Sequence, residues 1–399
     1  MTSISKITGL PLGPYPVGVT TVEFVDKSRT DPGDPSEPRR LQTEIWYPTV
    51  NSDNLPKNKF SDFLGGGAIP GSIELANGPR AIGGYRDGLT VAELDESVWI
   101  NDAVRDAEPA QAQDQKKWPL VMFSHGAGAF RPSYIYWTEF LASHGYVVAA
   151  PDHPGCARYT QIGGKVITPD GGPRSKYASM ARERPKDMIT VLDGIEAMSS
   201  DGTAAATDLQ RLLASRVDCQ NVAITGMSFG GTTTADILEL QDPRIRAAVF
   251  KCPAVYYTDR TNRKNRDTPI MVMLGTEDTV IGVKGNTAAR AYVDTHNDDA
   301  LLVEIVRGGH VSFTSCEIYN AEYGNGIGTQ CASLTKPGET YRPLDIVHQH
   351  GIINTYGLAF LNAHLRPGEQ DDAGKQLLLD AAKGNSPFSK EEIIVRSKM

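Results

Sequence analysis

The sequence has no long apolar run and no excess of basic residues, and these two absences narrow what the protein can be. No uninterrupted apolar stretch approaches the ~18 residues that a membrane-spanning helix needs. Among 399 residues, 40 are Lys or Arg and 48 are Asp or Glu, which gives a net charge of −8. This balance provides no basic surface for nucleic acid. We therefore expect neither a nucleic-acid partner nor a membrane-spanning segment.

Cysteine is scarce and is not arranged for metal binding. None of the five cysteines forms a CxxC pair, so a thiolate metal site is not expected. Cys316 and Cys331 lie 15 residues apart (331 − 316) in a loop-rich stretch. They could form a local disulfide, and free thiols are an equal alternative.

The N-terminus, MTSISKITGLPLGPYPVGV, has one lysine and lacks the apolar core of a secretory signal. We expect a cytoplasmic protein if Met1 is the natural start. If a signal sequence has been removed before residue 1, we expect a secreted or periplasmic protein.

What the sequence does have is a regular alternation of apolar strand patterns and helical patterns. Hydrophobic residues make up 40% of the chain and charged residues 22%, which is typical of a globular protein with a large core. The strand patterns, apolar on both faces, cover 119–124, 146–152, 221–226, 245–251, 269–275 and 300–306. Helical patterns stand between them. This alternation predicts an α/β fold with a mostly parallel central sheet and helices on both faces.

We expect a single domain with four parts. The N-terminal part, 13–50, contains two strand patterns of period two. Region 51–117 has weak patterns and several prolines, which favours an insertion that acts as a lid or pocket wall, or a plain loop excursion. The core covers about 118–366, and a C-terminal tail covers 367–399.

The stretch ITGMSFGGTTTADIL places Ser228 between two glycines, at the change from a buried strand to a helix. GMSFG fits the pattern G-x-S-x-G, in which a strained turn exposes a nucleophilic serine at the top of a sheet. Gly226 and Gly230 leave room where neighbouring backbone approaches closely. The position between strand and helix predicts that Ser228 is the nucleophile.

A serine hydroxyl needs a base, and the base needs a group that orients it. Asp278 follows a strand 50 residues after Ser228 (278 − 228), and His310 follows the next strand 32 residues later (310 − 278). The order Ser, Asp, His is that of the α/β-hydrolases. Parallel strands bring their carboxyl ends to one edge, so the three side chains can meet there.

Other residues compete for these roles. Glu277 is adjacent to Asp278 and is the rival acid, although a short side chain in a fixed turn orients an imidazole better. The remaining histidines precede Ser228 or lie in helical patterns, where structural roles are expected: His125, His144, His153, His296, His348, His350 and His364.

Acyl transfer also needs donors for the oxyanion, and the loss of one costs roughly 3 kcal/mol. One expected donor is the backbone N–H of Phe229, directly after the nucleophile. The loop FSHGAGAF, 123–130, predicts the N–H of Ala127 as the second. Tyr256, Tyr257 and Phe313 are weak candidates for substrate contact, with ordinary packing as the alternative.

The stretch PLVMFSHGAGAFRPSYIYWTEFLASHGYVVAAPDHPG (119–155) resembles the platelet-activating-factor acetylhydrolases and the bacterial proteins called predicted dienelactone hydrolases. GPYPVGVTTVEFVDKSR, EIWYP and RPKDMITVLDGI are similar as well, so the resemblance covers about 13–366. It implies an α/β-hydrolase fold, neither metal nor cofactor, and hydrolysis of esters that often carry short or modified acyl groups.

The resemblance also shows where this chain departs from the family. The animal phospholipid-cleaving members carry their aspartate just after the strand that follows the elbow helix, where this chain has Phe250, Lys251 and Cys252. The acid has moved to Asp278, as in cutinase-like polyester hydrolases. This departure argues against a phospholipid substrate. True dienelactone hydrolases use a cysteine nucleophile, so the serine argues against that substrate too.

These residues predict a serine hydrolase that cleaves a small-molecule carboxylic ester through an acyl-enzyme. The same triad could transfer the acyl group to another acceptor, as an acyltransferase or cyclase, or could cleave an amide. The alternative from another class is a non-catalytic binding protein with this fold. The sequence leaves the acyl chain, the leaving group and the oligomeric state open.

Overall fold

The structure is a computed structural model, in which the chain forms two compact units. The first comprises Met1–Ser3 and Leu12–Cys219, and the second comprises Ile4–Pro11 and Gln220–Met399. The structure describes residues 4–5, 8–32, 34–50, 55–64, 74–75, 78–79, 103–162, 165–167, 175–200, 205, 207–257, 263–315, 330–366 and 371–398. Much of the predicted insertion 51–117 lies outside these ranges. Each unit is described by itself, and the single-domain organisation stays a prediction.

The first unit is built on five strands in the order β6-β7-β2-β1-β5. They are β1 (Val17–Thr30), β2 (Pro38–Pro48), β5 (Val104–Arg105), β6 (Trp118–Ser124) and β7 (Val147–Pro151). Strands β6 and β7 are parallel, whereas β2 is antiparallel to both β1 and β7. The two N-terminal strands thus extend a parallel pair with an antiparallel hairpin.

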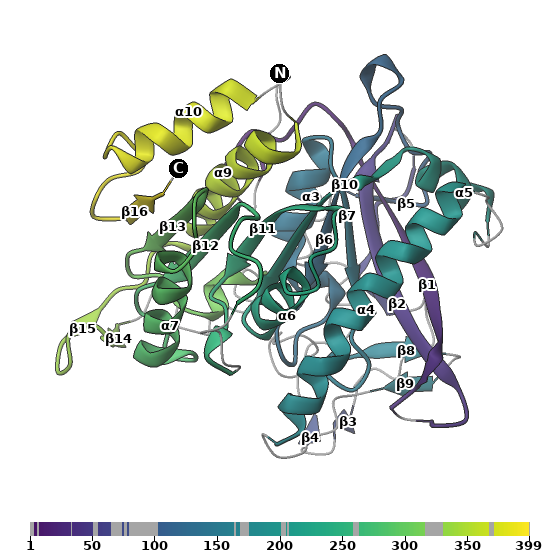
Figure 1. Ribbon diagram of the computed structural model, residues 1–399, viewed down its shortest axis with the longest axis horizontal. Coiled ribbons are helices and arrows are strands. Elements are labelled where there is room, and N and C mark those ends of the chain that lie inside the picture. Colours follow the sequence, from purple (N-terminus) through teal and green to yellow (C-terminus); the bar gives the residue numbers. More distant parts are fainter. Residues whose placement is uncertain are drawn as a thin grey trace. The chain divides into compact units, whose positions relative to one another are not determined.

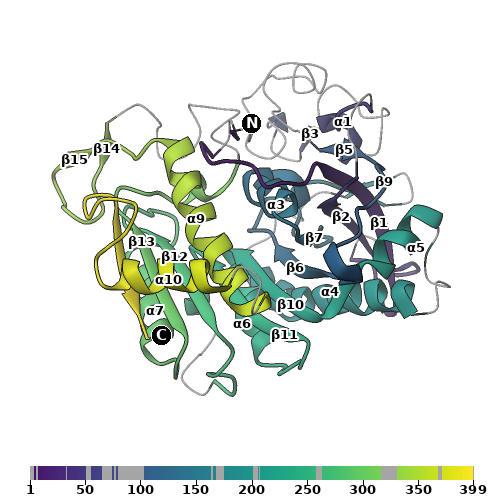
Figure 2. The ribbon, with the colours of Figure 1, turned by 90° about the horizontal axis from the view of Figure 1, so that it is seen from above.

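Helices cover both faces of this sheet. Helix α3 (Ile135–Ser143) contacts β1, β2 and β7, and α4 (Ser175–Ser200) contacts these strands and β6. Figure 2 shows the two helices on opposite sides of the strands. The smaller elements are α1 (Phe60–Phe63), α5 (Asp208–Ser215), β3 (Glu74–Leu75), β4 (Gly78–Pro79), β8 (Thr160–Ile162), β9 (Lys165–Ile167), η2 (Gln113–Gln115) and η3 (Arg131–Tyr134).

The second unit is built on a run of parallel strands, β10 to β13. They are β10 (Val217–Met227), which begins at the end of the first unit, β11 (Ile245–Lys251), β12 (Ile270–Gly275) and β13 (Ala300–Ile305). Each pairs in parallel with the next. Every residue of β12 and β13 is buried, as expected for strands covered on both faces.

Four helices pack around this run: α6 (Phe229–Leu238), α7 (Gly282–Asp294), α9 (Ile346–Leu365) and α10 (Asp371–Ala382). Figure 1 shows α9 and α10 on one side of β11 to β13, and α7 on the other. Short elements complete the unit: η4 (Val255–Tyr257), η5 (Val311–Phe313), β14 (Cys331–Ala332), β15 (Thr340–Tyr341) and β16 (Ile393–Ser397). None of the helices in the described ranges combines the length and apolar content needed to cross a membrane.

The predicted α/β class, with a mostly parallel sheet, is confirmed, and β11 matches the predicted 245–251. Strand β1 is longer than the period-two pattern at 17–25, because its ladder with β2 continues through the polar end and a register shift between Asp26 and Thr30. The segment that we named a tail contains α10 and β16. Strand β16 pairs antiparallel with β13, a long-range contact that its short pattern does not reveal.

A buried ion network fixes the sheet of the first unit. The guanidinium of Arg131, 3% exposed, donates from Nε to Oε2 of Glu44 at 3.0 Å and also binds Asp152. Both carboxylates are fully buried. Removing the partner of a buried carboxylate strongly lowers the free energy of unfolding, so we expect this unit to depend on Arg131 for its stability.

We predict that Arg131→Met destabilises the protein by about 3–5 kcal/mol, because it leaves two buried carboxylates short of positive charge. Urea unfolding measures the loss. The control is Arg40→Met, which removes a pair with Glu23 whose side chains are 33% and 30% exposed, and which should cost less than about 1 kcal/mol. Equal losses in the two variants would contradict the prediction.

Candidate active site

Ser228 lies in the second unit, between the end of β10 and the first residue of α6. Its φ of 56° and ψ of −115° are unusual for a residue other than glycine. The backbone holds this conformation, because Ser228 donates its N–H to the carbonyl of Lys251 at 2.9 Å and its carbonyl accepts from the N–H of Ala254 at 3.0 Å. Such a conformation costs about 1–3 kcal/mol and persists only where the surroundings impose it.

Glycine is required beside this serine. A Cβ at Gly226 would lie 2.2 Å from the carbonyl oxygen of Gly230, and a Cβ at Gly231 would lie 2.5 Å from Cβ of Pro253. Both distances are far below van der Waals contact. The first confirms that the close approach of backbone, and not chance composition, accounts for the glycine before the elbow.

Asp278 and His310 meet directly. Asp278 Oδ2 lies 2.6 Å from Nδ1 of His310, and the two residues are 0% and 6% exposed. The other carboxylate oxygen, Oδ1, accepts the N–H groups of Val280 at 2.9 Å and Ile281 at 3.0 Å, which fixes the carboxylate in its turn. A carboxylate beside Nδ1 favours the tautomer with the proton on that atom. Nε2 then has its lone pair available to accept a proton.

A third glycine lets the two loops come together. Gly275 ends β12, and a Cβ there would lie 2.4 Å from the carbonyl oxygen of Gly308, in the loop before His310. The N–H of Glu277 donates to the same carbonyl at 2.9 Å. The turn that carries Asp278 is therefore tied to the loop that carries His310.

The rival acid, Glu277, faces other groups. Its carboxylate accepts from the hydroxyl of Ser333 at 3.1 Å and binds the N–H of Leu334 and the hydroxyl of Thr335. These contacts tie the 333–335 loop to the end of β12. The geometry thus favours Asp278 over Glu277 as the partner of His310.

Cys252, at the position where the family resemblance places an aspartate, lies beside this pair. Its sulfur, a carboxylate oxygen of Asp278 and a ring nitrogen of His310 all lie within 4.8 Å of one another, and all three residues are buried. Burial, followed by the negative charge of Asp278, raises the pKa of the Cys252 thiol well above its usual value. The cysteine is therefore a neutral thiol at neutral pH.

Not every predicted contact is found within the described residues. Within the described residues the side chain of Ser228 has no hydrogen bond, so the step from Ser228 to His310 stays a prediction. Phe313 is fully buried in η5, as a packing residue would be. Tyr256 is half-buried in η4, and Lys284 Nζ lies 5.7 Å from the centre of its ring. The side chain of Tyr257 lies outside the described residues, and so does Cys316, on which the choice between a Cys316–Cys331 disulfide and free thiols depends.

The predicted oxyanion loop belongs to the first unit, and its backbone is held on both sides of Ala127. The N–H of Gly126 donates to the hydroxyl of Tyr134 at 3.0 Å, and the N–H of Gly128 donates to the carbonyl of Cys156 at 3.2 Å. Ala127 is exposed, and its N–H has no acceptor within the described part of the chain. This is what an oxyanion donor requires, although the roles of Ala127 and Phe229 stay predictions.

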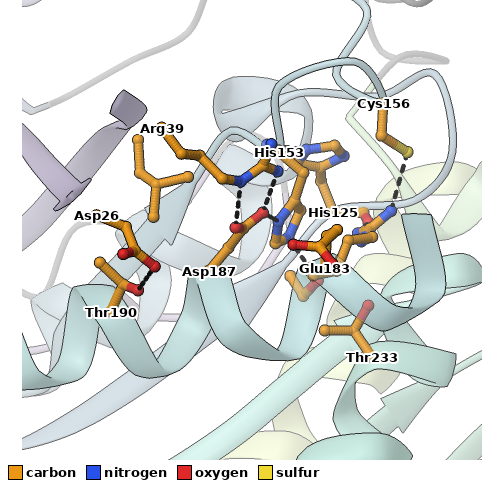
Figure 3. A network of polar contacts seen from close by, with 12 residues as sticks. Asp26, Arg39, His125, His153, Cys156, Glu183, Asp187, Thr190 and Thr233 are labelled. Atoms are coloured by element: carbon orange, nitrogen blue, oxygen red, sulfur yellow. Dashed lines mark hydrogen bonds and ion pairs between the residues drawn. The ribbon is translucent and has the colours of Figure 1, made fainter. Parts of the chain in front are cut away.

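The first unit also contains a buried Ser-His-Asp array, which no spacing in the sequence predicts. Ser124 Oγ lies 3.0 Å from Nε2 of His153. Nδ1 of His153 lies 2.9 Å from Oδ2 of Asp187, and Figure 3 shows these two side chains facing each other. All three residues are 0% exposed. Burial, followed by the charge of Arg184, lowers the pKa of His153 to about 3. A general base should have a pKa near the working pH, so this buried imidazole is a poor one.

Comparisons with known proteins find that parts of the chain are similar to platelet-activating factor acetylhydrolases. The family model for platelet-activating factor acetylhydrolase, isoform II, matches residues 69–161. The platelet-activating factor acetylhydrolase of Bos taurus is 32% identical over 264 residues, which are 59% of this chain and 53% of that protein. The enzyme of Cavia porcellus is 30% identical over 159 residues, 35% of this chain and 36% of that protein.

The chain has the α/β-hydrolase fold, and parts of it are similar to the platelet-activating factor acetylhydrolases. A ferulic acid esterase from Streptomyces cinnamoneus has the same fold, with a TM-score of 0.66 and 24% identity over 90% of this chain and 93% of that one. The chain matches between about a third and about half of the length of the two acetylhydrolases. Similarity to these relatives alone therefore does not establish the activity of this chain.

We predict that Gly226→Ala destabilises the protein by at least about 3 kcal/mol, because the added methyl group meets backbone that cannot move without displacing Ser228. Thermal unfolding measures the change. The control is Gly282→Ala, where φ is +66° but nothing lies within 4 Å of the added Cβ. It should cost about 1 kcal/mol from backbone strain alone. Similar losses in both variants would exclude the clash as the cause.

Proposed function

We propose that this α/β-hydrolase is a serine esterase that cleaves small-molecule carboxylic esters through an acyl-enzyme. The observation that carries the proposal is the 2.6 Å contact between Asp278 and Nδ1 of His310, in the unit that also presents Ser228 on a strained elbow. The contact orients an imidazole whose other nitrogen can take a proton. The strained turn is the conformation expected of a nucleophile between strand and helix.

The reaction follows from these groups. His310 Nε2 takes the hydroxyl proton of Ser228 as the serine oxygen attacks the ester carbonyl, while Asp278 stabilises the imidazolium. The N–H groups of Ala127 and Phe229 bind the tetrahedral oxyanion. The imidazolium gives its proton to the departing alcohol, and a water molecule, deprotonated by the same imidazole, then releases the acid and restores the serine.

The relatives support the class of bond and leave the acyl group open. The names of two of them describe the hydrolysis of an acetyl group, and that of the third describes an ester of ferulic acid. We take a carboxylic ester as the shared feature. A series of p-nitrophenyl esters of increasing acyl length, assayed with and without an added alcohol, identifies the preferred acyl group and separates hydrolysis from acyl transfer.

We predict that a fluorophosphonate labels the wild-type protein on Ser228 and that Ser228→Ala abolishes both labelling and ester hydrolysis, because the variant lacks the hydroxyl of the proposed nucleophile. Mass spectrometry of the labelled peptide locates the adduct. Ser124 provides an internal control, since its array is buried and has a weak base. Labelling of the Ser124 peptide, or labelling that survives in Ser228→Ala, would refute the assignment.

A second prediction tests the acid and uses the nearby Cys252. Asp278→Asn should lower kcat by about 10⁴-fold, because the amide stabilises the wrong imidazole tautomer. Since the sulfur of Cys252 and the nitrogen of His310 lie within 4.8 Å, a carboxylate at position 252 can reach the imidazole. Its φ of 40° is also one that aspartate tolerates.

The double variant Cys252→Asp/Asp278→Asn should therefore regain at least about tenfold in kcat over Asp278→Asn, because a carboxylate again orients the imidazole. Steady-state kinetics measures the recovery. Cys252→Asn/Asp278→Asn is the matched control and should regain nothing, since it adds the same shape without the charge. Recovery in both, or in neither, would show that a carboxylate next to His310 is not what the Asp278 variant lacks.

A further inference from the structure

The buried array in the first unit is a directed chain of hydrogen bonds that ends at the predicted oxyanion loop. Since Asp187 can only accept, Nδ1 of His153 carries the proton and its Nε2 accepts from the hydroxyl of Ser124. That hydroxyl in turn accepts from Nη2 of Arg184 at 2.9 Å. The donors Nη2 of Arg184, Oγ of Ser124 and Nδ1 of His153 thus each face an acceptor, and this arrangement requires a neutral imidazole.

The far end of the chain is anchored by charge. Arg39 donates from Nε and Nη2 to the two carboxylate oxygens of Asp187, at 2.6 and 2.7 Å (Figure 3). Nη1 of Arg29 donates to Oδ1 of Asp187 at 2.7 Å. Burial alone would raise the pKa of Asp187, but the hydrogen bonds and charge of Arg39, with the bond from His153, hold it well below its usual range. The carboxylate is therefore a permanent anion on α4.

The near end of the chain holds the loop. Arg184 also binds the carbonyl of His125, the residue between Ser124 and the loop glycine. The ring of His125 accepts the N–H of His153 on Nε2 at 3.1 Å, which leaves Nδ1 to donate to the carbonyl of Gly126 at 2.7 Å. Burial, followed by the charges of Arg184 and His153, lowers the pKa of His125 well below its usual value. Both histidines therefore stay neutral, and the carbonyls before Ala127 are fixed by donors from this one network.

We propose that the buried chain Arg184–Ser124–His153–Asp187 is a positioning device that sets the direction of the Ala127 N–H. It fixes the two peptide groups before Ala127 through His125 and Gly126, and so leaves that N–H as the loop's outward donor. The inference rests on the proposed function, because its effect on turnover requires Ala127 to bind the oxyanion. A Ser-His-Asp array with no solvent access thus serves the reaction of Ser228 without touching the substrate.

Ser124→Ala tests the device with the smallest possible change, because it removes one hydroxyl from the middle of the chain. Ser143→Ala is the matched control: Ser143 is 1% exposed, donates to the carbonyl of Phe140 at 2.7 Å and accepts the N–H of Gly13 at 3.0 Å in the same unit. Both variants lose one buried hydroxyl, and Ser143 Oγ has a third partner in Nδ1 of His144 at 3.2 Å. Only one of them lies next to the loop.

The readout compares p-nitrophenyl acetate with its thionoacetate, in which sulfur replaces the carbonyl oxygen. Sulfur accepts hydrogen bonds poorly, so the ratio of the two kcat/KM values reports on the oxyanion donors and does not depend on the fraction of folded enzyme. In Ser124→Ala we expect kcat for the ester to fall about tenfold and the ester-to-thionoester ratio to fall by at least about threefold. In Ser143→Ala the ratio should equal that of the wild type.

Hydrogen exchange supplies a readout that does not require turnover. The N–H groups of Gly126 and Gly128 should exchange at least about tenfold faster in Ser124→Ala than in the wild type or in Ser143→Ala, because the loop loses its anchor. Faster exchange together with a reduced ratio supports the proposal. An unchanged ratio in Ser124→Ala overturns it, whatever the exchange rates. A wild-type protein that shows no ester hydrolysis would instead refute the proposed function, while slow loop exchange in that protein would still show that the anchor exists.

Discussion

The proposed active site depends on a property of parallel sheets: the residues that follow neighbouring strands lie at the same edge of the sheet. In the second unit, Ser228 follows β10, Cys252 follows β11, Asp278 follows β12 and His310 follows β13. Residues far apart in the chain therefore become neighbours without any dedicated scaffold. One result is the 2.6 Å contact between the carboxylate of Asp278 and the imidazole of His310.

The buried array of Ser124, His153 and Asp187 shows why hydrogen-bond geometry alone does not make a nucleophile. In this array the Ser124–His153 and His153–Asp187 contacts are both present, at 3.0 Å or less. It lacks solvent access, and the cation Arg184 donates to its serine. A positive charge at that point opposes the formation of an imidazolium, so the array stays a static chain. Its burial and the nearby charge of Arg184 therefore indicate a structural role for this array.

Much of the fold and part of the candidate site could be predicted from the sequence, because both leave local signals. Apolar runs revealed β11, β12 and β13, and the glycines around Ser228 indicated the strained turn. The choice of Asp278 over Glu277 rested on side-chain length, and the structure supplies the reason, since Glu277 is occupied by residues 333–335. The His153–Asp187 contact could not be predicted, because it joins a loop to a helix 34 residues away with no spacing rule. Strand β16 was missed for the same reason.

The antiparallel strand β16 has a consequence for how the protein behaves among its own copies. Strand β13, which leads to His310, would otherwise present a row of unpaired backbone groups to any passing extended chain. The backbone groups of Leu301 to Ile305 pair with β16, so β16 forms the edge of the sheet in this unit. This short strand carries Arg396, and Lys398 follows it. The positive charge of Arg396 on this short edge strand, with Lys398 directly after it, discourages the addition of a further strand and so disfavours aggregation through this edge.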